Sequence, residues 1–486
     1  MPPKEKDEGW FERHTELSFV IKAFALIVFI IWFRGFIVRT MAYLWVFKVT
    51  LFLFLPFIIY SYLKYKAMIS RRSLFSVIKE HVTVMPFIYS AEKEKKRKDD
   101  LPLTTYGLIT LNILVFFLVE MNPALDVEAI MENLAFLPKH PNLWNAPLGA
   151  FTAMFLHGGQ AHLWGNMVFL WVVGTLVERR IGSLRFLWVY ITTGLIAGVA
   201  FVFVHYVFIG ELGRGIGASG AIAGIMGVFA VRCYFKTMIV PVPILGFLPV
   251  SLKVRVNSLT LMGVFFLLDL SGGIGQIAGA VAGIAHWAHL GGMTGGMIIA
   301  GFLGLAKGAV EERHLDIGVK ALDSNMGYGE GGESLKIALK QNPDNFEALL
   351  ALARMKTKFT AVGGGEGDVY YGQAVRAALK TSPSASAAIF KEYYKKYLKA
   401  VDAATMYRLA GILYREKDLE FASRCLEMCV DAKDAAPDVK ERALFQHAAM
   451  LDEMGHKDAA TGYYERFVRD YPNSVAVAKA KARLGR

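Results

Sequence analysis

Long apolar stretches separated by short polar segments occupy the first 310 residues or so of the chain. After a polar start, two apolar runs cover about 17–33 and 41–63. Six more lie near 104–120, 150–176, 184–209, 217–235, 256–270 and 281–305. Runs of this length and apolarity are typical of helices that cross a membrane. The pattern predicts an all-α fold: a polytopic membrane helix bundle with a six-helix core and an additional N-terminal pair.

The N-terminal pair, within residues 1–66, carries one lysine in each apolar run, Lys22 and Lys48. Two arrangements stay open for it: a spanning hairpin, which we favour, or helices that lie at the membrane interface. A charged linker at 67–103 follows and contains a run of Lys, Arg and Glu at 92–98. This run is either a solvated cytoplasmic segment or a contact with anionic lipids.

The pattern changes beyond about residue 310 to short helices with a repeat. The stretch from Ala443 to Pro472 has the small and aromatic positions of a tetratricopeptide repeat, and the stretch from Met406 to Pro437 is similar. Two weaker units end at Pro343 and Pro383. Residues 311–486 are therefore predicted to form a helical repeat domain. Such repeats stack into a concave surface that binds peptides, although a helical tail without a partner is the plainer alternative.

Composition narrows the class of protein. Of the 486 residues, 54% are apolar and 20% charged, which excludes a disordered chain. Three cysteines without CxxC spacing exclude a disulfide-stapled scaffold, and Cys233, Cys425 and Cys429 are expected to be buried thiols. The N-terminus has no pattern of a cleavable signal peptide.

The basic charge is distributed as in a membrane protein. The formal charge is +12, and residues 311–486 hold 27 basic and 25 acidic side chains, so about +10 lies in the apolar part. The loops at 177–185 and 232–255 are basic, whereas those at 121–149, 206–216 and 271–280 nearly lack Lys and Arg. The positive-inside rule puts the linker, the two basic loops and the C-terminal domain in the cytoplasm. This distribution predicts a multi-pass protein in contact with the bilayer and no nucleic-acid partner.

Polar residues inside spans are costly, so three clusters are candidates for function. The first is Gly217-Ala218-Ser219-Gly220, which opens the fourth core segment. A serine at a helix start has an exposed hydroxyl next to free backbone N–H groups that can bind an oxyanion. The alternative is a glycine-rich packing face with an incidental serine.

The second cluster is in the last core segment, where His286 and His289 precede Gly292 and Gly296. Two glycines four residues apart form a face on which helix backbones approach closely. His289 lies on that face, one turn from Gly292, and could reach a serine on a neighbouring helix. His286 is more simply a polar side chain satisfied within the bundle.

The third cluster opens the second core segment with His157, His162 and Asn166. Because His162 and Asn166 are four residues apart, they share one face of a helix. Both can donate hydrogen bonds to a developing oxyanion. Zinc is the competing interpretation of so many histidines, but neither histidine cluster has an acidic ligand or an HExxH pattern, so no metal or other cofactor is predicted.

Together these motifs resemble the rhomboid family of intramembrane serine proteases over about residues 100–306. The resemblance rests on His157-Gly158-Gly159, His162-x-x-x-Asn166, Glu178-x-x-x-Gly182-Ser183, Gly217-x-Ser219-Gly220, and Ala288-His289 with Gly292-x-x-x-Gly296. It implies a six-helix domain at 104–306 with a water-filled cavity open to the outside. It also implies cleavage of peptide bonds in or near transmembrane segments of other proteins.

The resemblance assigns roles to residues. Ser219 would be the nucleophile, and His289 the general base and then the general acid. His162, Asn166 and the backbone N–H of Ser219 would bind the oxyanion. The family uses a serine–histidine dyad, so Asp269, at the end of the fifth segment, is expected to be a loop or cap residue.

The resemblance also covers the surroundings of the site. Glu178 and Ser183 would form a structural hydrogen bond at the cytoplasmic end. Residues 271–281 would be a mobile cap, and substrate would enter between the second and fifth spans. One position departs from the family: an aromatic residue often stacks on the histidine from four positions after the serine, and here that position is Ala223.

Two other classes of function stay open. A non-catalytic membrane adaptor would bind transmembrane helices without cutting them, although such relatives generally lack the serine or the histidine. A metal-dependent membrane enzyme or transporter would use the histidines as ligands. We expect the protease, in a bacterial inner membrane, with transmembrane proteins as substrates and a protein or peptide partner on the C-terminal repeats.

Overall fold

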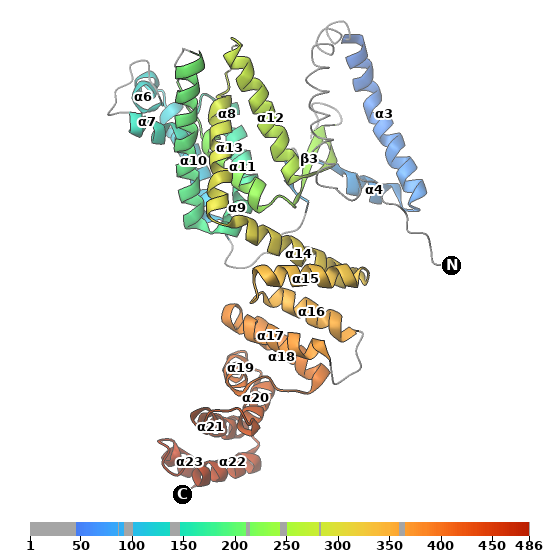
Figure 1. The fold of residues 1–486 in the computed structure, drawn as a ribbon, viewed down its shortest axis with the longest axis vertical. Helices are drawn as coiled ribbons and strands as arrows, with labels where there is room; N and C mark the ends of the chain where they lie inside the picture. Colours follow the sequence, from blue (N-terminus) through green and yellow to red (C-terminus); the bar gives the residue numbers. More distant parts are fainter. Residues whose placement is uncertain are drawn as a thin grey trace. The chain divides into compact units, whose positions relative to one another are not determined.

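A computed structural model shows how these segments fold (Figure 1). The structure describes residues 45–85, 87–91, 101–136, 146–209, 214–243, 250–280, 283–358 and 365–485. The predicted apolar run at 17–33 and the charged run at 92–98 lie outside these residues. The chain divides into two compact units, one of residues 1–98 with 236–261 and one of residues 99–235 with 262–486.

The first unit contains a long apolar helix and a small amphipathic one. Helix α3, Trp45–Ile69, covers most of the second apolar run. Helix α4, Leu74–His81, begins where the Ser73 hydroxyl accepts the backbone N–H of Ser76 at 3.2 Å, a typical N-cap. Leu63 and Ala67 of α3 pack against Val77 of α4.

The first unit also contains a four-stranded antiparallel sheet that was not predicted. Its order is β1-β4-β3-β2, and its strands are β1 Val82–Thr83, β2 Tyr89–Ser90, β3 Thr237–Pro243 and β4 Ser251–Asn257. The strands β3 and β4 pair from Thr237 opposite Asn257 to Pro243 opposite Ser251. The expectation of a plain loop at 232–255 was therefore wrong. Both strands are rich in the β-branched residues that favour a pleated surface, and β4 alternates them with basic residues.

The second unit holds helices that match the six predicted core segments, except that residues 258–261 at the start of the fifth helix fall in the first unit. They are α5 Leu103–Val115 with the π-helical turn η1 Phe116–Glu120, α8 Gln160–Phe169 with η3 Leu170–Gly174 and α9 Thr175–Ile181, α10 Ser183–Val204 with η4 His205–Ile209, α11 Ser219–Arg232, α12 Ser258–Ile277 and α13 His286–Phe302. Shorter helices precede α8: α6 Val127–Leu134, α7 Ala146–Thr152 and the 3₁₀ turn η2 Ala153–Phe155. The predicted helix bundle is confirmed, with the sheet as an addition.

Not all of these helices have the length and apolarity of a full membrane span. Within the described residues, three do: Leu103–Glu120, Ser183–Ile209 and Ser258–Ile277. A fourth arises if α13 and the following helix count as one span, but the chain bends by 80° between them. Helix α11 has only 14 residues, and α8 carries His162 and Asn166. The number of helices that cross the bilayer therefore stays a prediction.

Helix α12 is longer than expected at its C-terminal end. The predicted segment stopped at residue 270, and the expected cap began at 271, but α12 continues to Ile277. The glycines that suggested a loop serve close packing instead. A Cβ on Gly272 would lie 2.4 Å from Nε2 of His286, and a Cβ on Gly273 would lie 2.9 Å from Cε2 of Trp287. Residues 271–277 are thus part of the helix.

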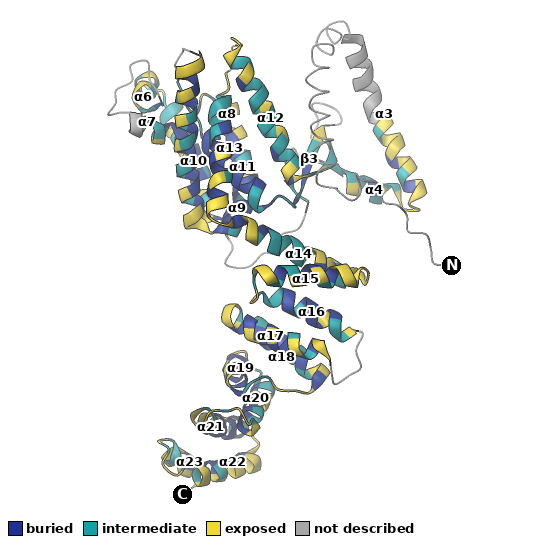
Figure 2. Ribbon diagram, viewed as in Figure 1, coloured by how far each residue is buried: buried dark blue, intermediate teal, exposed yellow. Residues whose placement is uncertain are grey.

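Helix α11 lies at the centre of the bundle, and every residue from Gly220 to Ala230 is buried (Figure 2). Glycines let its backbone touch that of α13. A Cβ on Gly292 would lie 2.1 Å from the carbonyl oxygen of Gly220, and a Cβ on Gly296 would lie 2.0 Å from that of Gly224. Real Cβ atoms do not come this close to backbone oxygen, so any side chain at either position would push the helices apart.

The rest of the second unit is a succession of helices, each packed against the next (Figure 1). They are α14 Leu305–Ser324, α15 Tyr328–Gln341, α16 Phe346–Lys358, α17 Glu366–Thr381, α18 Pro383–Tyr397, α19 Ala403–Arg415, α20 Leu419–Asp431, α21 Pro437–Glu453, α22 Lys457–Asp470 and α23 Val477–Arg483. Small and aromatic side chains fill the interior between them. Cys425 and Cys429 are buried and free, as expected, and burial raises the pKa of Cys425 to about 12.

Helix α14 joins this helical domain to the bundle. The carboxylate of Glu312 accepts hydrogen bonds from Arg180 Nη2 at 2.7 Å and Arg232 Nη1 at 2.8 Å. Both arginine side chains are largely buried, at 8% and 12% exposure. Arg180 lies at the end of α9 and Arg232 at the end of α11. One carboxylate therefore holds α14 against the ends of two bundle helices.

We predict that Gly296→Ala destabilises the protein while Gly301→Ala does not. The methyl group at 296 meets the backbone of α11, whereas nothing lies within 4 Å of a Cβ at 301 on the same helix. Overpacking of this kind costs about 1–3 kcal/mol, while alanine at an open helical position is neutral or favourable. Thermal unfolding in detergent micelles would measure both variants. Equal melting temperatures for the two would contradict the packing described here.

Candidate active site

The four residues expected to act in catalysis line one cavity of about 280 Å³. Ser219 borders it from the start of α11, His289 from α13, and His162 and Asn166 from α8. Asp269 and Phe265 of α12 complete its wall. We call this space the larger cavity. It brings together side chains from four helices that are separated by up to 127 positions in the chain.

Ser219 is the first residue of α11, and the loop before it is shaped by glycine. Gly217 has a φ of 118°, a conformation that other residues rarely adopt. Its N–H donates to the carbonyl of Ala153 at 2.8 Å. A Cβ on Gly217 would lie 2.8 Å from Cε1 of His162 and 3.6 Å from Nδ2 of Asn166. The glycine thus allows the loop that presents Ser219 to pass directly over the His162–Asn166 pair.

His162 and Asn166 present hydrogen-bond donors at the larger cavity. Nδ1 of His162 accepts the backbone N–H of Gly158 at 3.4 Å, which leaves Nε2 to carry the proton of the neutral ring. Asn166 is buried, and its amide Nδ2 has no hydrogen-bond partner. A buried amide donor without a partner costs free energy, so such groups call for an explanation. A bound anionic oxygen in the cavity would supply the missing acceptor.

His289 has an acidic partner, Asp269, which the sequence analysis expected in a loop or helix cap. Asp269 lies inside α12, and its Oδ1 is 3.1 Å from Nδ1 of His289 and 2.7 Å from Nδ1 of His286. The expectation that Asp269 is a loop or cap residue was therefore wrong. The error follows from ending the fifth segment at residue 270, because a residue at a helix end points to solvent more often than to a neighbouring helix.

Ser219 and His289 share the larger cavity without a direct bond. Within the described part of the chain, no hydrogen bond joins their side chains. Catalytic hydrogen bonds are often long in a free enzyme and tighten when substrate binds. Ala223, one turn after Ser219, is buried at the wall of the same cavity, where it offers no ring to stack on the histidine.

The described residues contain no group of three or more His, Cys, Asp and Glu side chains arranged to hold a metal ion. The histidines of the two clusters contact one another or a carboxylate. The His157 and His162 rings lie edge to face at 5.2 Å, and His286 and His289 share Asp269.

Comparison with known proteins identifies this part of the chain. Residues 142–306 match the family model described as the rhomboid domain. This segment belongs to the rhomboid family. The chain is 35% identical to rhomboid protease GluP of Bacillus subtilis over 227 residues, which are 44% of this chain and 38% of GluP. It is 27% identical to rhomboid protease AarA of Providencia stuartii over 212 residues, which are 40% of this chain and 70% of AarA.

A third relative matches a shorter part of the chain. Rhomboid protease GlpG of Klebsiella pneumoniae is 29% identical over 128 residues, which are 26% of this chain and 43% of GlpG. The chain thus spans well under half the length of GluP and GlpG. The rhomboid domain and the apolar helices make this chain an integral, multi-pass membrane protein.

The remaining motif residues of the rhomboid domain hold its helices in place. The buried carboxylate of Glu178 accepts four hydrogen bonds: from the N–H of Thr104 at 2.9 Å, the N–H and hydroxyl of Thr105 at 2.7 and 2.6 Å, and the hydroxyl of Ser183 at 2.6 Å. Gly182, with a φ of 83°, makes the turn between α9 and α10. Glu178 thereby satisfies the start of α5 and fixes it against that turn.

His157 is buried, and its backbone N–H donates to the Glu120 carboxylate at 2.9 Å. Glu120 was not singled out from the sequence. It ends an apolar run, and only the fold brings it to the loop before α8.

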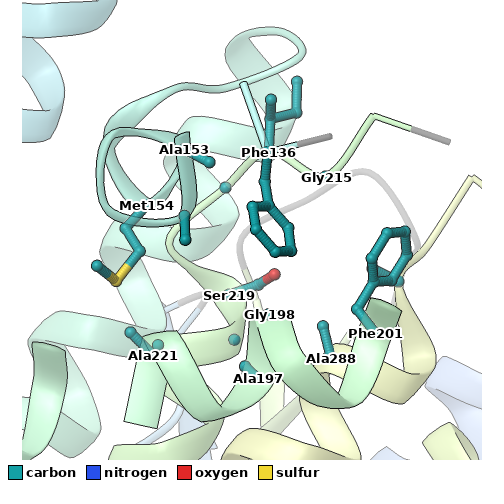
Figure 3. A pocket seen from close by; sticks show the side chains of 16 residues that line it. Phe136, Ala153, Met154, Ala197, Gly198, Phe201, Gly215, Ser219, Ala221 and Ala288 are labelled. Atoms are coloured by element: carbon teal, nitrogen blue, oxygen red, sulfur yellow. The ribbon is translucent and has the colours of Figure 1, made fainter. Parts of the chain in front are cut away.

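A second, smaller cavity of about 50 Å³ lies on another side of Ser219. Figure 3 shows the Ser219 oxygen below the ring of Phe136, with Phe201 and Ala288 nearby. The backbone of Phe136 pairs with that of Gly215 through two hydrogen bonds of 3.0 and 2.9 Å. Glycine and alanine form most of the remaining wall. The smaller cavity therefore has space for only a small apolar group, in contrast to the larger cavity that Ser219 also borders.

Proposed function

We propose that this chain is an intramembrane serine endopeptidase that cleaves peptide bonds in or near transmembrane segments of other membrane proteins. The main observation behind this proposal is that Ser219, His289, His162 and Asn166 line one cavity. The Asn166 side-chain amide has no hydrogen-bond partner there. The names of the relatives, all rhomboid proteases, support the same activity.

The proposed reaction begins with attack on the scissile carbonyl. The Ser219 oxygen bonds to the carbonyl carbon while His289 takes the hydroxyl proton at Nε2. The carbonyl oxygen becomes an oxyanion that accepts hydrogen bonds from Asn166 Nδ2, His162 Nε2 and the backbone N–H of Ser219. As the C–N bond breaks, His289 returns its proton to the leaving amine. A water molecule, activated by the same histidine, then hydrolyses the acyl-enzyme and regenerates Ser219.

The smaller cavity supports a preference for small residues at the cleavage site. With a volume of about 50 Å³ beside Ser219, it accepts a methyl-sized side chain more readily than a branched or aromatic one. We infer that a residue next to the scissile bond is small. Transmembrane segments with alanine, serine or glycine near the outer boundary fit this requirement.

The orientation and location of the chain are part of the proposal. The basic loops at 177–185 and 232–255 support a cytoplasmic C-terminal domain. The named relatives come from bacteria, which supports a bacterial inner membrane. Active-site residues at the starts of α8 and α11 would then lie in the outer half of the bilayer.

The C-terminal helices would act as a tetratricopeptide-like domain that recruits a partner or the soluble tail of a substrate. The helix succession from α14 to α23 supports this reading. A cavity of about 300 Å³ between α19, α20 and α21 offers a site for a peptide side chain. Tyr414 and Glu453 line it and hydrogen-bond to each other at 3.2 Å. Leu426 and Met450 add an apolar wall.

The protease prediction is tested in proteoliposomes with a model transmembrane substrate that carries small residues at its outer boundary. We expect the wild type to cleave it, Ser219→Ala and His289→Ala to lose cleavage, and a chelator to have no effect. Asn166→Ala should lower kcat by about 10²–10³, as expected for one oxyanion donor. Asn133→Ala, on the exposed side of α6, is the matched control and should cleave like the wild type.

Other outcomes would favour the remaining functions. A well-folded wild type that binds transmembrane helices without cutting several different substrates, and binds equally well as Ser219→Ala, would support the adaptor. Loss of activity on chelation would support a metal-dependent enzyme.

A truncation tests the C-terminal domain separately. A chain ending after Asn325 keeps all of α14, and with it Glu312 and its hydrogen bonds to Arg180 and Arg232. We expect it to cleave the model substrate at the wild-type rate and its natural substrate more slowly. Comparing membrane-protein fragments from cells that carry the wild type or Ser219→Ala would identify that substrate. A chain ending at 310 is the comparison for stability. It also loses Glu312 and its hydrogen bonds to Arg180 and Arg232, so it should unfold at a lower temperature than the chain ending after Asn325. If the chain ending after Asn325 lost cleavage of both substrates equally, the recruitment role would be contradicted.

A further inference from the structure

Asp269 makes a contact that the serine–histidine reaction does not require. Its Oδ1 lies 3.1 Å from Nδ1 of His289 and 2.7 Å from Nδ1 of His286. The side chains of Asp269 and His289 are 16% and 19% exposed, so the pair is mostly shielded from solvent. Asp269 also borders the larger cavity together with Ser219. A carboxylate is therefore hydrogen-bonded to Nδ1 of the histidine proposed as the general base.

The contact with Asp269 determines which nitrogen of the His289 ring carries the proton. A carboxylate can only accept hydrogen bonds, so Nδ1 of His289 must carry the proton in this pair. In the neutral ring the lone pair is then on Nε2, the atom that must take the proton of Ser219. A hydrogen bond to one ring nitrogen thus sets both the tautomer and the direction of the other nitrogen.

We propose that Asp269 is a positioning residue that holds His289 in the tautomer and orientation needed for proton transfer from Ser219. This inference rests on the proposed function. Asp269 would take over the task of the aromatic residue that family members often place where this chain has Ala223. It acts from α12 rather than from α11, and through a hydrogen bond to Nδ1 rather than by stacking.

His286 completes this arrangement. A single buried carboxylate is costly unless several donors satisfy it. With Nδ1 of His286 at 2.7 Å, Asp269 has a second donor that keeps its side chain in place independently of His289. His286 is one turn before His289 on α13, so the same helix supplies both donors. The close packing of Gly272 against the His286 ring fixes this donor in turn.

A purely structural role is the competing interpretation, since the contact also ties α12 to α13. One other hydrogen bond ties these helices: Trp287 Nε1 donates to the Gly273 carbonyl at 3.2 Å. A second, from Gln276 Nε2 to the Ile284 carbonyl at 2.7 Å, ties α12 to the segment just before α13. Trp287→Phe removes one of these ties without touching Asp269 or His289. It is therefore the matched control.

The test compares wild type, Asp269→Asn and Trp287→Phe, all as full-length protein in proteoliposomes with the model transmembrane substrate. Titration with a fluorophosphonate that labels the active-site serine gives the fraction of active enzyme, so that kcat is counted per active site. We expect Asp269→Asn to lower kcat at least tenfold and to change KM less than twofold. Trp287→Phe should keep both within twofold of the wild type. A kcat within twofold in folded Asp269→Asn, or a fall explained by fewer active sites, would overturn the inference.

A second measurement decides the question even when Asp269→Asn does not fold. Nitrogen-15 NMR of the wild type labelled at histidine distinguishes the two neutral tautomers, and His289→Gln identifies the signal. Protonation at Nδ1 of His289 is the expected result, and protonation at Nε2 would overturn the inference. A wild type that neither cleaves nor reacts with the fluorophosphonate would instead refute the proposed protease function, and this inference with it.

Discussion

The contact between α11 and α13 is the constraint on which the site depends. Gly220 and Gly224 of α11 face Gly292 and Gly296 of α13 so closely that no side chain fits between the backbones. Ser219 directly precedes this contact on one helix, and His289 lies one turn before it on the other. The distance between nucleophile and base is therefore set by two backbones rather than by flexible side chains. The hydrophobic effect contributes little to the association of helices in lipid. Close packing of this kind is therefore a main source of the stability of the helix bundle.

The polar groups within the bundle divide into those that are satisfied and those that are not. The Glu178 carboxylate accepts four hydrogen bonds, and Asp269 accepts from two histidines. Both are therefore locked in one arrangement. The Asn166 amide, in contrast, is buried at the cavity without a partner. A donor that is held rigidly at the cavity and has no partner in the free protein can stabilise a negative charge that forms only during the reaction.

Much of this architecture was predictable from the sequence. Apolar runs predicted the core helices, and the Gly-x-x-x-Gly spacing at 292 and 296 indicated the close helix contact. Motif residues on separate segments indicated a shared site, because His162, Asn166 and Ser219 fell near the starts of their segments and His289 only about two turns deeper in its own. These predictions worked because membrane spans have long, strong patterns and because one helical turn places residues four apart on one face.

What was missed depends on contacts between distant segments. The strands at 82–83 and 89–90 are too short to recognise, and they pair with a hairpin more than 140 residues away. Asp269 was misplaced because the following Ser-Gly-Gly suggested a helix end, whereas the glycines pack against His286 and Trp287. No local pattern shows that an aspartate on one helix faces a histidine 20 positions later on another. Only the packing of α12 on α13 brings them together.

The most direct test of the central claim is a structure of the protein after reaction with a fluorophosphonate, a mimic of the tetrahedral intermediate. The account predicts a bond from the Ser219 oxygen to phosphorus. It also predicts a phosphoryl oxygen within hydrogen-bond distance of Asn166 Nδ2, His162 Nε2 and the Ser219 N–H, with His289 still bound to Asp269. An adduct on another residue, or a phosphoryl oxygen turned away from Asn166 and His162, would contradict it.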